Sequence, residues 1–246
     1  MILPLLMTFI MIFSQGPQPQ DEIRVAVASN FSIAMTAVAK RYEAMSGHKV
    51  ILMFGSTGKH YAQIRNGAAL DAFFSADAER PTLLERDHIA VPGSRFTYAV
   101  GKIILWSPKK DYVDSEGRVL AERKFRHLAI ANPKLAPYGK AAQQVLQARG
   151  LWDALGKRLV RGEDVGQTFQ FVRSGSAELG FIALSQVKRP GRAVAGSWWD
   201  VPQSLYSPIE QQAVLLNKRD AARGFMAFVR SEEARKIIRN YGYETP

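Results

Sequence analysis

The sequence contains no cysteine, so the chain can form neither a disulfide scaffold nor a thiolate metal site. It has no low-complexity tract and no internal repeat. It also lacks a Gly-x-Ser-x-Gly motif, the usual nucleophile signal of a serine hydrolase. The four histidines show no paired spacing such as i, i+4, so we expect them at the surface rather than around a metal cation: His48, His60, His88 and His127.

Acidic residues are the scarcer charged class. The 22 Asp and Glu stand against 33 Lys and Arg, which gives a net charge of +11. A basic chain can bind nucleic acid, but here the cations are spread along the sequence and no nucleic-acid motif is present. We therefore expect a solvated basic surface and no nucleic-acid partner.

Charge is absent altogether from residues 1–20, where residues 2–13 form an apolar run. A run of 12 residues is too short to span a bilayer but suits the core of a secretory signal. A basic segment before the run and a small-x-small cleavage site are both missing. Residues 1–20 are therefore predicted to be a signal peptide or an N-terminal anchor, and the rest of the chain to be exported.

From residue 21 onward the sequence alternates between strand and helix patterns. Strands are predicted at 24–28, 50–55 and 71–76, with helices at 31–42, 59–66 and 81–86. This β-α-β-α-β order predicts a parallel sheet with helices on both faces. In such sheets, ligands bind beyond the carboxyl ends of the strands.

The second half of the chain predicts another α/β unit. Residues 96–106 read as one long apolar strand containing Gly101, which suits a crossover between two lobes. Strands are then predicted at 127–131, 158–160, 179–184 and 210–216, a helix at 163–173, a loop at 191–208 and one helical segment at 220–241. We expect one lobe from residues 21–100 plus 208–246, another from 101–207, and a ligand cleft between them.

Hydroxyl and amide side chains follow two of the predicted strands. Ser29 and Asn30 come after the strand at 24–28, and Ser56 follows the strand at 50–55, where it can cap the next helix. The first amides of a helix have no intrahelical partner, and the helix dipole favours an anion there. The two loops therefore predict one shared anion site.

Several segments in order resemble the periplasmic molybdate-binding protein of molybdate ABC transporters. They are AVASNF, VILMFGSTGKHYAQIRNGAALDAFFSAD, ANPKLAPYGKAA, GEDVGQTFQFVRSGSAELGFIAL and VRSEEARKIIRNYGY. The resemblance covers about residues 24–243. It implies a two-lobed type II periplasmic-binding-protein fold, each lobe a mostly parallel sheet flanked by helices, with a tetrahedral oxyanion held between the lobes.

The resemblance also implies a set of ligand-binding residues. These are Ser29, Asn30, Ser56, Tyr138 of the PYG motif, and Val165 through its backbone N–H. One branch of the family places a tyrosine at the position of Ala183 instead, so Tyr138 is expected to supply the phenol here. No protein-ligated metal and no cofactor are implied, since molybdenum is present only within the bound oxyanion.

The function implied is non-enzymatic: a monomeric, periplasmic binding protein that passes molybdate or tungstate to an ABC permease of the inner membrane. Another binder of tetrahedral oxyanions, for sulfate or phosphate, is the first alternative. An effector-sensing domain of a regulator is the second, although no helix-turn-helix segment is found. A hydrolase on the same lobes is the third, and it lacks a nucleophile–base set.

Overall fold

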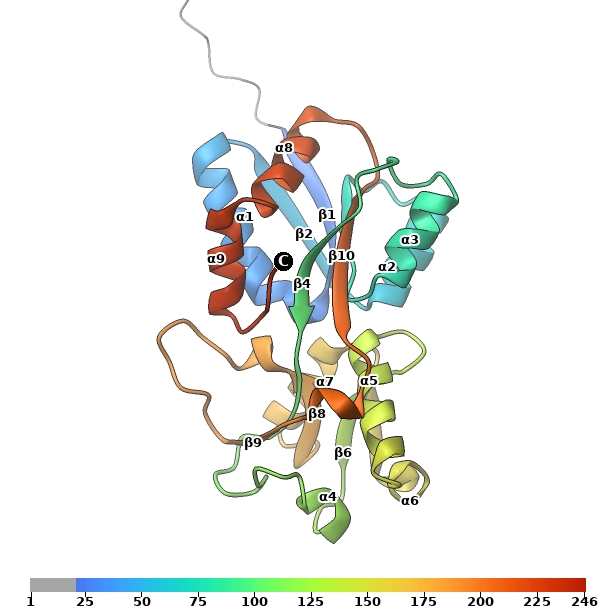
Figure 1. The fold of residues 1–246 in the computed structure, drawn as a ribbon, viewed down its shortest axis with the longest axis vertical. Helices are drawn as coiled ribbons and strands as arrows, with labels where there is room; N and C mark the ends of the chain where they lie inside the picture. The colour runs from blue at the N-terminus through green and yellow to red at the C-terminus, as the bar shows by residue number, and fades with distance from the viewer. Residues whose placement is uncertain (1–20) are drawn as a thin grey trace, which may run out of the picture.

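The computed structural model describes residues 21–246, so the predicted signal or anchor at 1–20 lies outside the described residues. Its elements form two lobes, one above the other in Figure 1. The strands are β1 (Glu22–Ala28), β2 (Lys49–Gly55), β3 (Ala72–Phe74), β4 (Phe96–Gly101), β5 (Ile103–Ser107), β6 (Leu128–Ala131), β7 (Leu159–Gly162), β8 (Leu179–Ala183), β9 (Ser197–Asp200) and β10 (Ile209–Leu215). The α-helices are α1 (Ser32–Ser46), α2 (Thr57–Arg65), α3 (Glu79–Arg86), α4 (Val119–Glu122), α5 (Pro137–Ala148), α6 (Trp152–Leu155), α7 (Val165–Arg173), α8 (Asp220–Val229) and α9 (Glu232–Asn240).

Each lobe is built on one five-stranded sheet. The first has the order β2-β1-β3-β10-β4, and the second has the order β7-β6-β8-β5-β9. The neighbours of β1 and of β6 pair with them in parallel, whereas β10 and β5 pair with their neighbours antiparallel. Both sheets are therefore mostly parallel, with one reversed strand each.

Helices cover both faces of the first sheet. In Figure 1, α1, α8 and α9 lie on one side of it, and α2 and α3 lie on the other. The first group packs on β1 and β10 through a core that includes Phe31, Val38 and Phe225. The opposite face packs through Ile64, Phe73 and Leu84. A strand buried on both faces has to be apolar throughout, which explains the run Val25–Ala28 of fully or almost fully buried residues.

The crossover at residues 96–106 is two strands rather than the one predicted. β4 belongs to the first sheet and β5 to the second, with Lys102 between them. The chain returns to the first lobe through β10 (Figure 1). Two chain crossings therefore join the lobes at residues 101–103 and 200–209.

Two other predictions of local structure are wrong. The loop expected at 191–208 contains β9, which pairs with β5 and so depends on a contact about 95 residues away that no local pattern shows. The helical segment expected at 220–241 is two helices, because Ser231 caps a new helix by accepting a hydrogen bond from the Ala234 amide at 3.2 Å.

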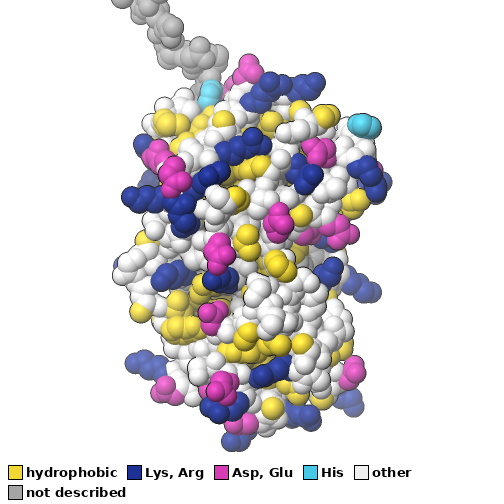
Figure 2. Space-filling view, in the orientation of Figure 1, with side chains coloured by type: hydrophobic (Ala, Val, Ile, Leu, Met, Phe, Trp, Pro, Cys, Tyr) yellow, Lys and Arg dark blue, Asp and Glu magenta, His cyan; other side chains and the backbone are white. Residues whose placement is uncertain are grey.

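Charged side chains are distributed over both lobes. Figure 2 shows Lys and Arg among Asp and Glu on the visible face, with no single basic stripe. Within residues 21–246, no helix is long and apolar enough to cross a membrane.

Candidate functional site

A small cavity lies between the two lobes, and all five predicted site residues line it. Its empty volume is about 170 Å³. Five chain segments meet there, four of them at the start of a helix and the fifth, at Ala76, in the loop after β3. The lining residues are Ala28, Ser29, Asn30, Gly55, Ser56, Thr57, Ala76, Ala136, Pro137, Tyr138, Asp164 and Val165. None of them is a lysine or an arginine.

Ser56 directly follows β2 and caps α2. Its Oγ accepts a hydrogen bond from the Lys59 amide at 3.2 Å, so the hydroxyl proton is left to donate elsewhere. The Gly58 amide donates to the Leu135 carbonyl of the other lobe at 2.9 Å, and the His60 amide donates to the Ser56 carbonyl. Of the first amides of α2, that of Thr57 remains for a ligand in the described structure.

The start of α7 is arranged in the same way. Asp164 caps it by accepting from the Gln167 amide at 2.9 Å, and the Asp164 carbonyl accepts from the Thr168 amide. The Gly166 amide donates a hydrogen bond across the cleft to Ser29 Oγ at 3.2 Å. Of the first amides of α7, that of Val165 therefore remains for a ligand, and it is the group that the resemblance implies.

Ser29 and Asn30 play different parts. Because Ser29 Oγ accepts from Gly166, its own proton can point into the cavity. The side-chain nitrogen of Asn30 is instead occupied by Gln211 Oε1 at 2.8 Å and by the Tyr243 hydroxyl at 3.0 Å. Asn30 can therefore serve a ligand through its backbone amide, while its side chain ties the loop to β10 and the C-terminal segment.

Tyr138 is the second residue of α5 and is 2% exposed. Its hydroxyl has no hydrogen-bond partner within the described residues. Burial raises the pKa of Tyr138 well above 10, so the phenol stays protonated and can donate. Because Gly139 and Lys140 both donate to the Ala136 carbonyl, the Tyr138 amide is left at this helix start.

The site thus gathers neutral donors from both lobes: four backbone amides and three hydroxyls. The amides are those of Asn30, Thr57, Tyr138 and Val165, and the hydroxyls are those of Ser29, Ser56 and Tyr138. Such a set can surround a tetrahedral anion that only accepts hydrogen bonds. It also avoids the desolvation cost of buried lysine or arginine.

Three features of the site were not predicted. Thr57 lines the cavity and fixes the loop after β3, because its Oγ1 accepts from the Ala76 amide at 3.0 Å. Asp164 was readable as a cap, since Asp directly before an apolar helix is a common start signal. The ion pair between Lys59 and Glu163, at 2.8 Å, joins the two lobes outside the cavity, and no sequence pattern connects residues so far apart.

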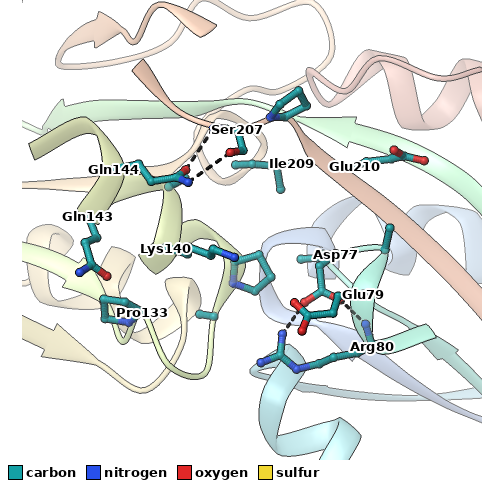
Figure 3. Close-up of a pocket in the computed structure, with 16 residues that line it drawn as sticks. Asp77, Glu79, Arg80, Pro133, Lys140, Gln143, Gln144, Ser207, Ile209 and Glu210 are labelled. Carbon is teal, nitrogen blue, oxygen red and sulfur yellow. Dashed lines mark hydrogen bonds and ion pairs between the residues drawn. The ribbon is translucent and has the colours of Figure 1, made fainter. Parts of the chain in front are cut away.

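A larger groove lies beside this cavity, with an empty volume of about 1140 Å³ (Figure 3). Its walls carry both signs of charge, such as the ion pair between Asp77 and Arg80. Gln144, also in the wall, forms two hydrogen bonds with Ser207. Within residues 21–246, no group of three or more His, Asp or Glu side chains is placed to hold a metal ion.

His60 is buried at 5% exposure, which corrects the prediction that all four histidines lie at the surface. It sits on the buried face of α2, with Nδ1 3.2 Å from Gln63 Oε1 and the ring packed edge-on against Phe73. Burial lowers the pKa of His60 below its ordinary value of 6.5. The neutral ring therefore belongs to the folded state.

This lowered pKa predicts a pH-dependent stability. As the pH falls below about 6.5, the unfolded chain binds a proton at His60 that the folded chain resists, so the free energy of unfolding decreases. We expect His60→Gln to reduce the drop in the unfolding midpoint between about pH 7 and pH 5. The exposed His88→Gln serves as the control and should leave the drop unchanged. An equal pH dependence in wild type and His60→Gln would contradict the assignment.

Comparison with known proteins adds an independent line of evidence. The family model for bacterial extracellular solute-binding proteins matches residues 23–244. The molybdate-binding protein ModA of Azotobacter vinelandii is 50% identical over 225 residues, covering 90% of this chain and 89% of that protein. ModA of Rhodobacter capsulatus is 44% identical, covering 93% and 90%. The solved structure of the periplasmic molybdate-binding protein of Azotobacter vinelandii superposes with a TM-score of 0.88 at 43% identity, covering 91% of this chain and 99% of that one.

Proposed function

This chain belongs to the bacterial extracellular solute-binding proteins, and from that premise we propose that it captures molybdate, or tungstate, and delivers it to an ABC importer. It has the two-lobed periplasmic-binding-protein fold, as the resemblance implied. It is a transport protein and not an enzyme. The observation that carries the ligand assignment is the small interlobe cavity lined by neutral donors and by no cation.

Hydrogen-bond polarity favours a fully deprotonated dianion. Every group that we assign to the ligand donates. Ser29, Ser56 and Tyr138 do so through hydroxyls, and the backbone amides are those of Asn30, Thr57, Tyr138 and Val165. Hydrogen phosphate would have to point its own proton at one of these donors. A buried polar group that is left without a hydrogen-bond partner costs about 1–3 kcal/mol. Molybdate and sulfate avoid this cost, and cavity size then separates the two.

The contacts between the lobes describe a closed cleft. The Gly58–Leu135 and Gly166–Ser29 hydrogen bonds both cross it, and so does the Lys59–Glu163 ion pair. Release of the anion therefore requires breaking these contacts, which a membrane permease could favour by binding an open form. The proposal places the protein in the periplasm as a monomer and includes no cofactor and no nucleic-acid partner.

Thermal unfolding in the presence of single oxyanions tests the ligand assignment. Molybdate at 1,000 times its dissociation constant should stabilise the folded state by about 4 kcal/mol. For a chain of this length that raises the unfolding midpoint by roughly 8–16 °C. Tungstate should act similarly, and sulfate and phosphate much less at equal concentration. A shift with phosphate alone would overturn the assignment in favour of the other oxyanion binder.

A further inference from the structure

Two buried polar atoms that have no hydrogen-bond partner within residues 21–246 meet directly behind the anion cavity. They are the hydroxyl of Tyr138 and the side-chain nitrogen Nε2 of Gln211. Both face the same side of Gly101: a β-carbon built there would overlap the Tyr138 hydroxyl and would lie 2.6 Å from Gln211 Nε2. Gly101 ends β4 at the crossover between the lobes, so the absence of a side chain is what lets these two groups approach.

The hydrogen bonds that Oε1 accepts fix the orientation of the Gln211 side-chain amide. Gln211 is fully buried on β10, and its Oε1 accepts from Asn30 Nδ2 at 2.8 Å and from the Tyr98 hydroxyl at 3.0 Å. Asn30 in turn donates to Tyr243, whose hydroxyl lies 2.8 Å from both the Asn30 carbonyl and Ser185 Oγ. Because this network occupies Oε1, it leaves the amide nitrogen facing Tyr138.

An amide nitrogen can only donate, so in a hydrogen bond between these two groups the oxygen of Tyr138 must be the acceptor. The single proton of the Tyr138 hydroxyl would then be turned away from Gln211. Tyr138 also lines the anion cavity, where that proton has an acceptor once a dianion is bound. Gln211, which does not line the cavity, thus determines whether the Tyr138 hydroxyl donates to the ligand or accepts from it.

We propose that Gln211 is a positioning residue of the anion site: its amide fixes the Tyr138 hydroxyl as a donor and so favours oxyanions that carry no proton. This role rests on the proposed function and deepens it. The Gln211 amide also counteracts part of the rise that burial causes in the pKa of Tyr138, as expected of a donor to the phenol oxygen. A site with the amide reversed would make Tyr138 donate to Gln211 and present a lone pair to the ligand.

The test is Gln211→Glu, which has nearly the same shape but replaces the donor by an acceptor. Tyr138 should then donate to the new carboxylate and present its lone pairs to the cavity. Calorimetry at slightly alkaline pH, where molybdate and hydrogen phosphate are both dianions, separates this effect from simple charge repulsion, which weakens both ligands alike. We expect the preference for molybdate over hydrogen phosphate to fall at least about tenfold, which corresponds to about 1.4 kcal/mol.

Control variants separate positioning from a purely structural role. In a Tyr138→Phe background, Gln211→Glu should not change the preference, because the phenol that carries the effect is gone. Gln212→Glu adds the same charge to the next residue of β10, whose side chain bonds Arg95, Thr97 and Glu210 instead, and should leave the preference unchanged. If Gln211→Glu does not fold, Gln211→Met removes the donor without adding charge and should reduce the preference by a smaller factor.

The possible failures are distinguishable. If wild type binds molybdate but Gln211→Glu keeps the wild-type preference, the positioning role is wrong and the proposed function stands. An equal fall with and without the Tyr138 hydroxyl would also overturn the role, since the charge would then act directly. If wild type binds no molybdate, the proposed function fails and this inference fails with it.

Discussion

Replacing Ser56 by alanine is expected to weaken molybdate binding about 5- to 150-fold while lowering stability only modestly. The substitution removes a hydroxyl that donates to a buried dianion, a loss worth roughly 1–3 kcal/mol. It also removes the cap of α2, because Ser56 Oγ no longer accepts from the Lys59 amide. Loss of a serine cap costs about 1 kcal/mol of folding free energy. Calorimetric titration and thermal unfolding measure the two effects separately.

The chain offers a matched control for this substitution. Ser231 caps α9 with the same geometry, since its Oγ accepts from the Ala234 amide at 3.2 Å, but it does not line the cavity. Ser231→Ala should therefore lower stability by a similar amount and leave the affinity for molybdate unchanged. If Ser56→Ala and Ser231→Ala bind molybdate equally well, Ser56 is only a helix cap and not a ligand-binding residue.

Replacing Gly58 or Gly166 by leucine is expected to hold the two lobes apart. A β-carbon at Gly58 would lie 3.0 Å from the Leu135 carbonyl oxygen of the second lobe. One at Gly166 would lie 2.9 Å from Asp164 Oδ1 of its own helix cap and 3.2 Å from the Ser29 β-carbon of the first lobe. A leucine at either position has to displace the opposite backbone or loop. Overpacking of this kind costs about 1–3 kcal/mol. At Gly58 the contact with Leu135 is made only in the closed state, whereas at Gly166 the contact with Asp164 is also present in the open state.

The clearest readout of this second prediction, in Gly58→Leu, is a loss of affinity without a loss of stability. Leucine in a helix is favoured over glycine by up to about 1 kcal/mol, so unliganded Gly58→Leu should unfold at the wild-type temperature or above it. Gly166→Leu should lose part of this gain, because its side chain also crowds Asp164 Oδ1. The affinity of both variants for molybdate should fall roughly 5- to 150-fold. Gly156→Leu is the control, because a β-carbon there meets nothing within 4 Å. Wild-type affinity in Gly58→Leu and Gly166→Leu would contradict closure of the lobes at these contacts.

Local chemistry made the framework of the site readable in the sequence. Ser56 follows a strand and precedes an amphipathic helix, and that arrangement alone indicates a cap with spare donors at its start. The same pattern at Ser29 also marks a site loop, although Ser29 caps no helix and its Oγ accepts from the Gly166 amide instead. Parallel strands then bring such loops to one edge of a sheet, so their convergence follows from the predicted strand order.

The roles of individual atoms could not be read in this way. The Asn30 side chain donates to Gln211 and Tyr243, about 180 and 210 positions further along the chain, so its use away from the cavity becomes visible only in the fold. The orientation of the Tyr138 hydroxyl likewise depends on Gln211 and on the bare backbone of Gly101. By contrast, Ser231 followed by two glutamates is a local start signal that divides the predicted helix at 220–241.

The crystal structure of the molybdate complex, with the metal located by its anomalous scattering, tests the central claim most directly. We expect one molybdenum position in the small interlobe cavity. Its oxygens should lie within about 2.7–3.2 Å of the hydroxyls of Ser29, Ser56 and Tyr138 and of the amides at the helix starts, with no lysine or arginine in contact. Molybdenum in the larger groove lined by Arg80 and Lys140, or oxygens held by a cationic side chain, would contradict recognition by neutral donors.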